Sequence, residues 1–415
     1  MIRGVKARQV FDSRGFPTIE CNLKTDKGIF RAMVPSGAST GSHEALELRD
    51  GGVHYRGKGV LKAVSNVNNI ISRKITGKAL NQNEIDQLMI SLDGTPNKSR
   101  LGANAILSVS MAVCRAGAYH SGKPLHDYIG TLAGVKKKFI PVPLLNVING
   151  GKHAGIENDI QEHMIVPVGA KSFSEAMMMS VEIYQSLKNT LKKRFGASAT
   201  NIADEGGFAP DIKGLKERLE IITRAIEQCG YAKKVSLALD CAASEFFDGE
   251  FYHIRESKFS PGELADYYED LCSVFNIISI EDGMAEDDWD GWAEMTRKLG
   301  KKIQIVGDDL LVTNTKRIED AIRKKAANSA LIKPNQIGTV TETINAVTLA
   351  HKNKWSTVIS HRSGETEDSF IADFVVGVGS SQIKTGAPAR SERLAKYNQL
   401  LRIEDEYRFP YARIR

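Results

Sequence analysis

Charged side chains stand at the ends of several apolar segments in the second half of the chain. The segment "IQIVGDDLLVTN", residues 303–314, runs from apolar residues into two adjacent carboxylates, Asp308 and Asp309. An unpaired buried carboxylate is costly, so this pair requires a cation, hydrogen-bond donors or a position at the mouth of a cleft. The same arrangement recurs in segments that end at Asp240, Glu281, Lys333, His361 and Lys384.

These charged positions follow one another at intervals of about 23 to 41 residues, which is the length of a strand, a helix and their connections. Six such units in a row predict an α/β barrel. The carboxyl ends of parallel barrel strands share one rim, and active sites lie at that rim. We therefore expect the charged side chains to converge there.

Three of the rim residues, Asp240, Glu281 and Asp308, offer only oxygen ligands. Hard divalent cations such as Mg²⁺ prefer oxygen ligands and keep positions open for water and substrate. A single acid at a strand end is as readily explained as the cap of the next helix. Three acids in register favour a metal site.

Basic and hydroxyl side chains on the following strands could act on a bound anion. Lys333 would lie beside a bound divalent cation and another cation, which makes it a candidate general base, because neighbouring positive charge and partial burial both lower the pKa of a lysine. The alternative for Lys333 is a structural ion pair with one of the acids. The segment "SHRSGET" supplies His361, Arg362 and Ser363. These residues could bind a phosphate or carboxylate through two parallel hydrogen bonds, with the serine hydroxyl beside them.

Glycine-rich loops carry further polar residues. "PSGASTG" could present N–H groups or a hydroxyl to a phosphate or metal, although many such loops only turn a corner. "NIADEGGFAP", "NGGKHAG" and "DIQEHMI" contribute Asp204, Glu205, His153, Gln161 and Glu162. A carboxylic acid that faces a lysine base across a metal-bound substrate would be a general acid. The residues together predict proton abstraction beside a metal-bound carboxylate, with departure of a group on the neighbouring carbon.

The elements that position these residues divide the chain into two parts. Alternating patterns separated by turn residues predict three antiparallel strands in "VKARQVF", "TIECNLKT" and "IFRAMVP", and helical periodicity follows at residues 60–75 and 102–118. The lysines and prolines of "AGVKKKFIPVPLLNV" indicate a boundary, after which the clearest helix is predicted over 174–195. We expect an N-terminal α+β domain, residues 1–133, and a C-terminal α/β barrel, residues 134–415.

Composition narrows the class of protein. The chain of 415 residues is 42% hydrophobic and 26% charged, has no apolar run long enough to span a bilayer, and starts with charged residues unlike a signal peptide. We therefore expect a cytoplasmic globular protein without a membrane span. Five scattered cysteines argue against a disulfide framework or structural zinc. The net charge of +6 comes without basic runs interleaved with aromatics, so nucleic-acid binding is not predicted.

The same motifs carry a resemblance that covers essentially the whole chain. The sequence is similar to the enolases, or phosphopyruvate hydratases, in "VPSGASTG", "NGGKHAG", "DEGGFAP", "SIEDGMAEDDW", "VGDDLLVTN", "KPNQIGT", "SHRSGETEDSFIAD" and "QIKTGAPARSERLAKYNQLLRI". The resemblance implies a cap domain followed by a modified eight-stranded α/β barrel in which not every strand is parallel. It also implies reversible dehydration of 2-phospho-D-glycerate to phosphoenolpyruvate, a reaction of glycolysis and gluconeogenesis.

The resemblance implies two Mg²⁺ per active site. Asp240, Glu281 and Asp308 resemble the ligands of the first ion, and Ser39 resembles a ligand of the second. Asp309 would then be a supporting neighbour.

The resemblance further implies the groups that move protons and bind substrate. Lys333 corresponds to the base that takes the C2 proton, and Glu205 to the acid that protonates the departing 3-hydroxyl, with Glu162 assisting it. The implied substrate contacts are His153, Glu162, His361, Arg362, Ser363 and Lys384.

Two positions receive no catalytic role. His163 stands where the enolases usually have an apolar aromatic residue, and we expect a histidine packed beside its strand. Lys152 lies at a position that varies in the family.

Two other functions are open at this point. A non-catalytic barrel could be a scaffold for a protein or RNA partner, which a broken site would favour, yet every matched metal and proton-transfer position is intact. A Mg²⁺-dependent acid-sugar dehydratase of the same superfamily would be expected to bind an unphosphorylated acid, and "SHRSG" and "SGASTG" argue against it. The resemblance implies a homodimer or an assembly of dimers.

Overall fold

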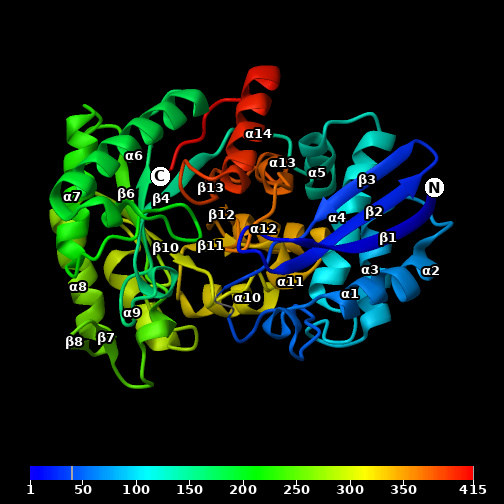
Figure 1. Cartoon of the computed structure of the whole chain (residues 1–415), viewed down its shortest axis with the longest axis horizontal. Helices are drawn as coiled ribbons and strands as arrows, with labels where there is room; N and C mark the ends of the chain where they lie inside the picture. The colour runs from blue at the N-terminus through cyan, green and yellow to red at the C-terminus, as the bar shows by residue number, and fades with distance from the viewer. Residues whose placement is uncertain (39–40, 415) are drawn as a thin grey trace.

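The computed structural model describes residues 1–38 and 41–414, which form two parts lying side by side (Figure 1). The N-terminal part holds the predicted three-stranded antiparallel sheet. Its strands are β1 (Ile2–Phe11), β2 (Pro17–Thr25) and β3 (Gly28–Met33). Its helices are α1 (Leu61–Asn66), α2 (Ser72–Ile75), α3 (Gln82–Asp93), α4 (Ala103–His120) and α5 (Leu125–Ala133).

The helices of this part cover the sheet. Helix α4 packs against β2 and β3, and its many alanine and serine side chains are buried in that contact. The helix predicted over 60–75 forms with one π-helical turn, Val67–Ile71, between α1 and α2. The predicted domain boundary lies in the segment between the end of α5 and the first barrel strand, and its position after residue 133 stays a prediction.

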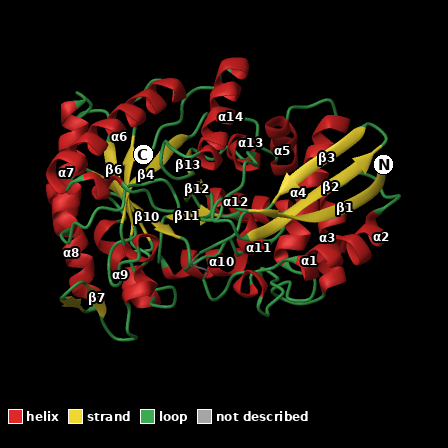
Figure 2. Cartoon of the chain, in the orientation of Figure 1, coloured by secondary structure: helices red, strands yellow, loops and turns green. Residues whose placement is uncertain are grey.

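The second part is a closed barrel of eight strands in the order β10-β11-β12-β13-β4-β5-β6-β9 (Figure 2). Six of the strands end at or just before the predicted charged positions. The eight are β4 (Val142–Asn149), β5 (Glu162–Val166), β6 (Ser236–Asp240), β9 (Ile277–Glu281), β10 (Gln304–Gly307), β11 (Ser329–Ile332), β12 (Ser356–Ser360) and β13 (Gln382–Lys384).

One barrel strand runs against the others. Strand β5 pairs antiparallel with both β4 and β6, whereas the remaining neighbours are parallel. The first residue of β5, Glu162, therefore lies opposite Asp240, the last residue of β6. This reversal brings a strand's amino end to the rim where the other strands finish.

Helices surround the barrel (Figure 2). Several begin at the caps that their sequences indicate, such as the capping box of Ser260 and Glu263 before α8. They are α6 (Phe173–Phe195), α7 (Leu215–Gln228), α8 (Pro261–Val274), α9 (Trp289–Leu299), α10 (Thr315–Lys324), α11 (Pro334–Ile337), α12 (Val340–Lys352), α13 (Phe370–Gly377) and α14 (Ser391–Tyr407). A small hairpin joins β7 (Tyr252–Ile254) to β8 (Ser257–Phe259).

Side chains alternate along the barrel strands between two apolar layers. On β6, Leu237 and Leu239 pack into the layer under the helices, whereas Ala238 belongs to the core inside the barrel. Because the strand period is two, Asp240 faces the same way as Ala238. In the same way Asp308 follows Val306 and Lys333 follows Leu331 of the inner core. The inner core thus fixes which side chains reach the rim.

Ion pairs hold the N-terminal part against the barrel. Arg115 of α4 makes two bonds of 2.7 Å to Asp368, and Lys98 lies 2.9 Å from Glu342 on α12. No helix within the described ranges is long and apolar enough to traverse a bilayer.

Candidate active site

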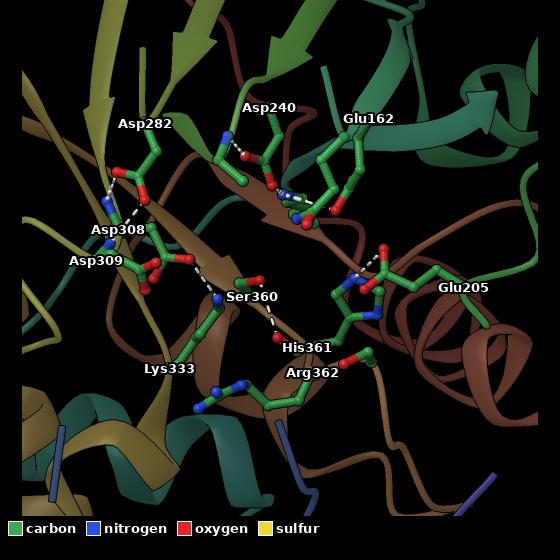
Figure 3. A pocket seen from close by; sticks show the side chains of 14 residues that line it. Glu162, Glu205, Asp240, Asp282, Asp308, Asp309, Lys333, Ser360, His361 and Arg362 are labelled. Carbon is green, nitrogen blue, oxygen red and sulfur yellow. Dashed lines mark hydrogen bonds and ion pairs between the residues drawn. The ribbon is translucent and has the colours of Figure 1, made fainter. Parts of the chain in front are cut away.

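The carboxyl end of the barrel forms a pocket lined by charged side chains from most of its strands (Figure 3). Lys333 and Glu205 lie on opposite sides of it in this view. Among the described residues that line the pocket, six are carboxylates and three are cations, so ionised acids would leave an excess of negative charge. The lining residues include Glu162, Glu205, Asp240, Asp282, Asp308, Asp309, Lys333, His361, Arg362, Ser363 and Lys384.

Lys384 is the centre of an acidic cluster. Its Nζ lies 2.7 Å from Asp240 Oδ2, 2.9 Å from Glu281 Oε1 and 3.3 Å from Glu162 Oε1. Burial alone would lower the pKa of Lys384, but the carboxylates of Asp240, Glu162 and Glu281 outweigh it and hold that pKa well above its ordinary value. A cation thus already occupies the space between two of the predicted metal ligands.

The acids of this cluster are held in an environment that disfavours their charge. Burial, followed by repulsion from Asp240, raises the pKa of Glu281 well above its ordinary value. Burial, followed by repulsion from Glu205, does the same for Glu162. A carboxyl group with a raised pKa carries a proton more readily, which suits Glu162 to assist an acid.

Lys333 and Asp308 form a second ion pair at the rim, between Nζ and Oδ2. Burial is the largest influence and lowers the pKa of Lys333, but the carboxylates of Asp308, Glu281 and Asp309 together raise that pKa above the ordinary value for lysine. Burial likewise raises the pKa of Asp308, and Lys333 more than offsets it and lowers that pKa. The predicted lowering of the pKa of Lys333 depends on a divalent cation bound beside it, and it stays a prediction.

A ring of hydrogen bonds fixes this pair. The N–H of Lys333 donates to Thr313 Oγ1 at 2.9 Å, and that hydroxyl donates to Gln336 Oε1 at 2.8 Å. Gln336 Nε2 then donates to Asp308 Oδ1 at 2.8 Å. Thr313 and Val312 adopt left-handed backbone conformations, which is unusual for β-branched residues and shows that the surrounding contacts enforce the geometry.

Asp282 fixes the backbone of Asp308 and Asp309. Its two oxygens accept hydrogen bonds from the N–H groups of Asp308 at 2.7 Å and Asp309 at 2.9 Å. Burial, followed by repulsion from Asp309 and Asp308, raises the pKa of Asp282 well above its ordinary value. Sequence analysis assigned no role to Asp282, although its place directly after Glu281 was a signal of a second acid at the same strand end.

The opposite wall carries Glu205 and His361. His361 Nε2 lies 3.6 Å from Glu205 Oε2, and both side chains are buried. Figure 3 shows both pointing into the pocket.

Arg362 and Ser363 face the N-terminal part. Arg362 binds both carboxylate oxygens of Glu44, at 2.9 and 3.1 Å, and also Asn335 Oδ1 at 3.1 Å. Ser363 Oγ accepts a hydrogen bond from the N–H of Ala38 at 2.9 Å. Arg362 therefore makes a bidentate contact with an anion, and in this structure that anion is the carboxylate of Glu44.

The glycine and serine loop approaches the same rim. A Cβ at Gly41 would lie only 3.0 Å from Asp309 Oδ1, so the absence of a side chain allows this close approach. Ser39 itself lies outside the described residues. Its described neighbours, Ala38 and Gly41, border Ser363 and Asp309 respectively.

The structure describes the side chain of Lys152 but not that of His153, both in the "NGGKHAG" loop. His153 belongs to a 3₁₀ helix, Gly151–Ala154, and its side chain lies outside the described part. Lys152 forms an exposed ion pair of 2.9 Å with Glu245.

His163 is buried behind the pocket, where its Nδ1 lies 3.1 Å from the carbonyl oxygen of Ile148.

The carboxylate oxygens at the rim fit a hard divalent cation as ligands. The ammonium of Lys384 between Asp240 and Glu281 shows that this position accommodates a cation. Within the described chain, carboxylate oxygens of Asp282, Asp308 and Asp309 also lie within 4.8 Å of one another, close enough to share an ion. Oxygen-only surroundings of this kind favour Mg²⁺ over softer metals.

Comparisons with known proteins cover both parts of the chain. Residues 2–129 match the family model described as "Enolase, N-terminal domain", and residues 137–409 match "Enolase, C-terminal TIM barrel domain". The chain is 54% identical to the enolase of Solanum lycopersicum over 422 aligned positions, which cover 98% of this chain and 95% of that protein.

Proposed function

The chain belongs to the enolase family and is therefore a lyase of the phosphopyruvate hydratase type, and we propose that its pocket dehydrates 2-phospho-D-glycerate reversibly to phosphoenolpyruvate. One observation carries the assignment of the groups that transfer protons. A lysine, Lys333, and a carboxylic acid, Glu205, line opposite sides of one pocket with oxygen ligands between them. This arrangement serves removal of a proton from one carbon and of a hydroxyl from the next.

In the forward direction Lys333 Nζ takes the proton from C2 of the substrate. The electron pair of that C–H bond first moves onto the substrate carboxylate as an enolate, and it then forms the C2–C3 double bond as the C3–O bond breaks. Glu205 gives its proton to the departing hydroxyl, which leaves as water. Glu162, whose pKa is raised by burial and by the charge of Glu205, supports the protonated state of this acid pair.

Lys333 must be neutral to accept a proton, and its pairing with Asp308 opposes this. Asp240, Glu281 and Asp308 would hold the first of two Mg²⁺ ions, with Ser39 contributing to the second. When bound, the ions would supply positive charge that draws Asp308 away from Lys333 and stabilises the extra negative charge on the substrate carboxylate. The proton transfers are made by Lys333 and Glu205.

The substrate's anionic groups have separate contacts. Arg362 and Ser363 would bind the phosphate, with Arg362 exchanging part of its contact with Glu44 for the phosphate oxygens. Lys384 would bind the carboxylate, and we assign His153 and His361 to contacts near the reacting carbons. Family membership supports a homodimer or an assembly of dimers and a cytoplasmic location for this enzyme.

Two variants test the proton-transfer roles separately. Lys333→Ala is expected to abolish both turnover and exchange of the C2 proton with solvent, because the base is gone. Glu205→Gln is expected to keep C2 exchange and lose dehydration, because only the acid is changed. The measurements are loss of deuterium from C2-labelled 2-phosphoglycerate by NMR and formation of phosphoenolpyruvate at 240 nm.

Exchange at the normal rate in Lys333→Ala would remove Lys333 as the base. Full dehydration by Glu205→Gln would place the acid elsewhere.

A further inference from the structure

Arg393 is a buried arginine behind the pocket to which neither the sequence analysis nor the proposed reaction assigns a role. It lies in the first turn of α14, and its side chain is fully buried. Its guanidinium donates to the carbonyl oxygens of Arg362 at 2.6 Å and Asp204 at 3.0 Å and also to that of Ser363. One side chain of the C-terminal helix therefore ties together the loops that carry His361 and Glu205.

The same guanidinium contacts the ring of His361. Arg393 Nη1 lies 2.7 Å from His361 Nδ1. An arginine has N–H donors and no acceptor, so Nδ1 of His361 must offer its lone pair and carry no proton. A neutral imidazole then carries its proton on Nε2, the nitrogen that lies 3.6 Å from Glu205 Oε2.

We propose that Arg393 is a positioning residue that fixes His361 as the Nε2–H tautomer, so that His361 is a permanent hydrogen-bond donor toward Glu205 and never carries the reaction's proton. The mechanistic half of this proposal rests on the proposed function; the tautomer itself does not. With Nε2 already protonated and Nδ1 engaged by Arg393, the ring can accept a proton only by breaking the arginine contact. The acid role is thereby left to Glu205.

The surroundings of the ring agree with this assignment. Burial lowers the pKa of His361 to about 4, and the positive charge of Arg393 acts in the same direction, against the carboxylates of Glu205 and Glu365. The neutral ring is therefore the form present at pH 7. The charge of Arg393 is itself balanced by Glu392, whose Oε1 lies 3.6 Å from Arg393 Nε.

The backbone leaves room for this contact at a glycine. Gly386, in the segment after β13, has a φ of +80°. A Cβ there would lie 3.0 Å from Arg393 Cδ and 3.1 Å from His361 Cε1. The close packing holds the arginine and the imidazole against each other and limits rotation of the ring.

The decisive measurement is the ¹⁵N spectrum of the histidine rings in the wild-type protein at pH 7, labelled only at histidine. The His361 signals are identified by their loss in His361→Asn. We expect the Nδ1 resonance of an unprotonated nitrogen and the Nε2 resonance of a protonated one. An Nδ1–H tautomer or a protonated ring would overturn the proposal, and this result needs no active enzyme.

A matched pair of variants tests the consequence for catalysis. Arg393→Lys keeps the charge but cannot reach His361 and the three carbonyls together. Arg390→Lys makes the same exchange at a neighbour that also binds Glu392 but otherwise contacts Ala203 and Ser13. For Arg393→Lys we expect mixed His361 tautomers and dehydration about 10- to 100-fold slower, the usual cost of losing a partner that orients a functional histidine. Exchange of the C2 proton stays near its wild-type rate, because Lys333 is untouched.

For Arg390→Lys we expect unchanged His361 signals and unchanged dehydration. If Arg393→Lys slows C2 exchange and dehydration equally, or keeps both the tautomer and the rate, the positioning role is refuted. If Arg393→Lys does not fold, Arg393→Gln replaces it, because glutamine removes the charge and the guanidinium but keeps an unbranched polar side chain. A wild-type protein that shows the expected tautomer but does not dehydrate 2-phosphoglycerate would refute the proposed function and leave the tautomer assignment standing.

Discussion

The two ends of the same barrel strands carry different kinds of polar side chain. At the amino end, Gln304 and Gln382 bind each other at 2.7 and 3.1 Å, and Ser279 and Ser356 complete the bonds of Gln304 at 3.2 and 3.0 Å. At the carboxyl end, the neighbouring positions are acids and lysines with displaced pKa values. Strand β13 shows both ends within three residues, since it begins at Gln382 and ends at Lys384.

The difference separates stability from function. Neutral amides and hydroxyls that satisfy one another need no ligand, and they fix the register of the strands at little electrostatic cost. Buried acids in excess of cations repel one another, and such a group persists where a ligand or a reaction requires it. The barrel thus places its structural polar network at one end and its costly charged network at the other.

Removal of the lysine from β13 tests the charged end most severely. Lys384→Met leaves Asp240, Glu281 and Glu162 without their shared cation and removes the proposed contact to the substrate carboxylate. We expect kcat/KM to fall by about 10²- to 10³-fold, the cost of one preorganised electrostatic contact. The rate is followed at 240 nm, and circular dichroism checks that the fold persists.

The same change at the other end of the strand is the matched control. Gln382→Met removes both bonds between the two buried amides and leaves Gln304 with only Ser279 and Ser356, and we expect the free energy of unfolding to fall by about 1–3 kcal/mol. Urea titration measures this loss, and kcat/KM is expected to stay near the wild-type value. A loss of activity in Gln382→Met as large as that in Lys384→Met would show that the two ends do not divide the roles.

His163 sharpens the comparison, because it adjoins Glu162 on β5 but faces away from the pocket. Burial, followed by the charge of Arg218, holds the pKa of His163 well below its ordinary value. The unfolded chain therefore binds this proton more readily than the folded chain, and stability falls as the pH drops below about 6.5. His163→Phe removes this penalty, so its unfolding free energy should fall by about 1 kcal/mol less than that of the wild type between pH 7.5 and 5.5.

Urea titrations of both proteins at the two pH values measure the difference. Equal losses of stability would show that His163 is not a buried neutral histidine. A large effect on kcat/KM at pH 7.5 would contradict its structural role.

Local patterns in the sequence foretold much of this architecture. The antiparallel meander, the helix near 174–195 and six barrel strands followed from periodicity and spacing, and the structure confirms these elements. The six strands end at or one residue before Asp240, Glu281, Asp308, Lys333, His361 and Lys384. Resemblance to the enolases added the eight-stranded barrel with a reversed strand. From the residues alone, β4 and β5 were not recognised as strands, because β4 is buried along its length and lacks alternation, and β5 starts at its charged end.

What the sequence did not show depends on contacts between distant residues. Arg393 is close to His361 only because α14 folds back over the barrel, and Glu44 reaches Arg362 from the other part of the chain. The pKa of Lys333 depends on which charge lies closest, and spacing alone cannot rank Asp308 against Arg362. The place of Asp282 at the rim could have been predicted, because it directly follows Glu281 in the sequence.

We propose that the charged rim is a divalent-metal lyase site, and a direct test is available. Purified wild-type protein is mixed with 2-phosphoglycerate and Mg²⁺ while absorbance at 240 nm is recorded, and EDTA is then added. We predict a rise in absorbance as phosphoenolpyruvate forms, which stops on chelation and resumes with excess Mg²⁺. A folded protein that gives no rise, or a rise that EDTA leaves unchanged, would contradict the account.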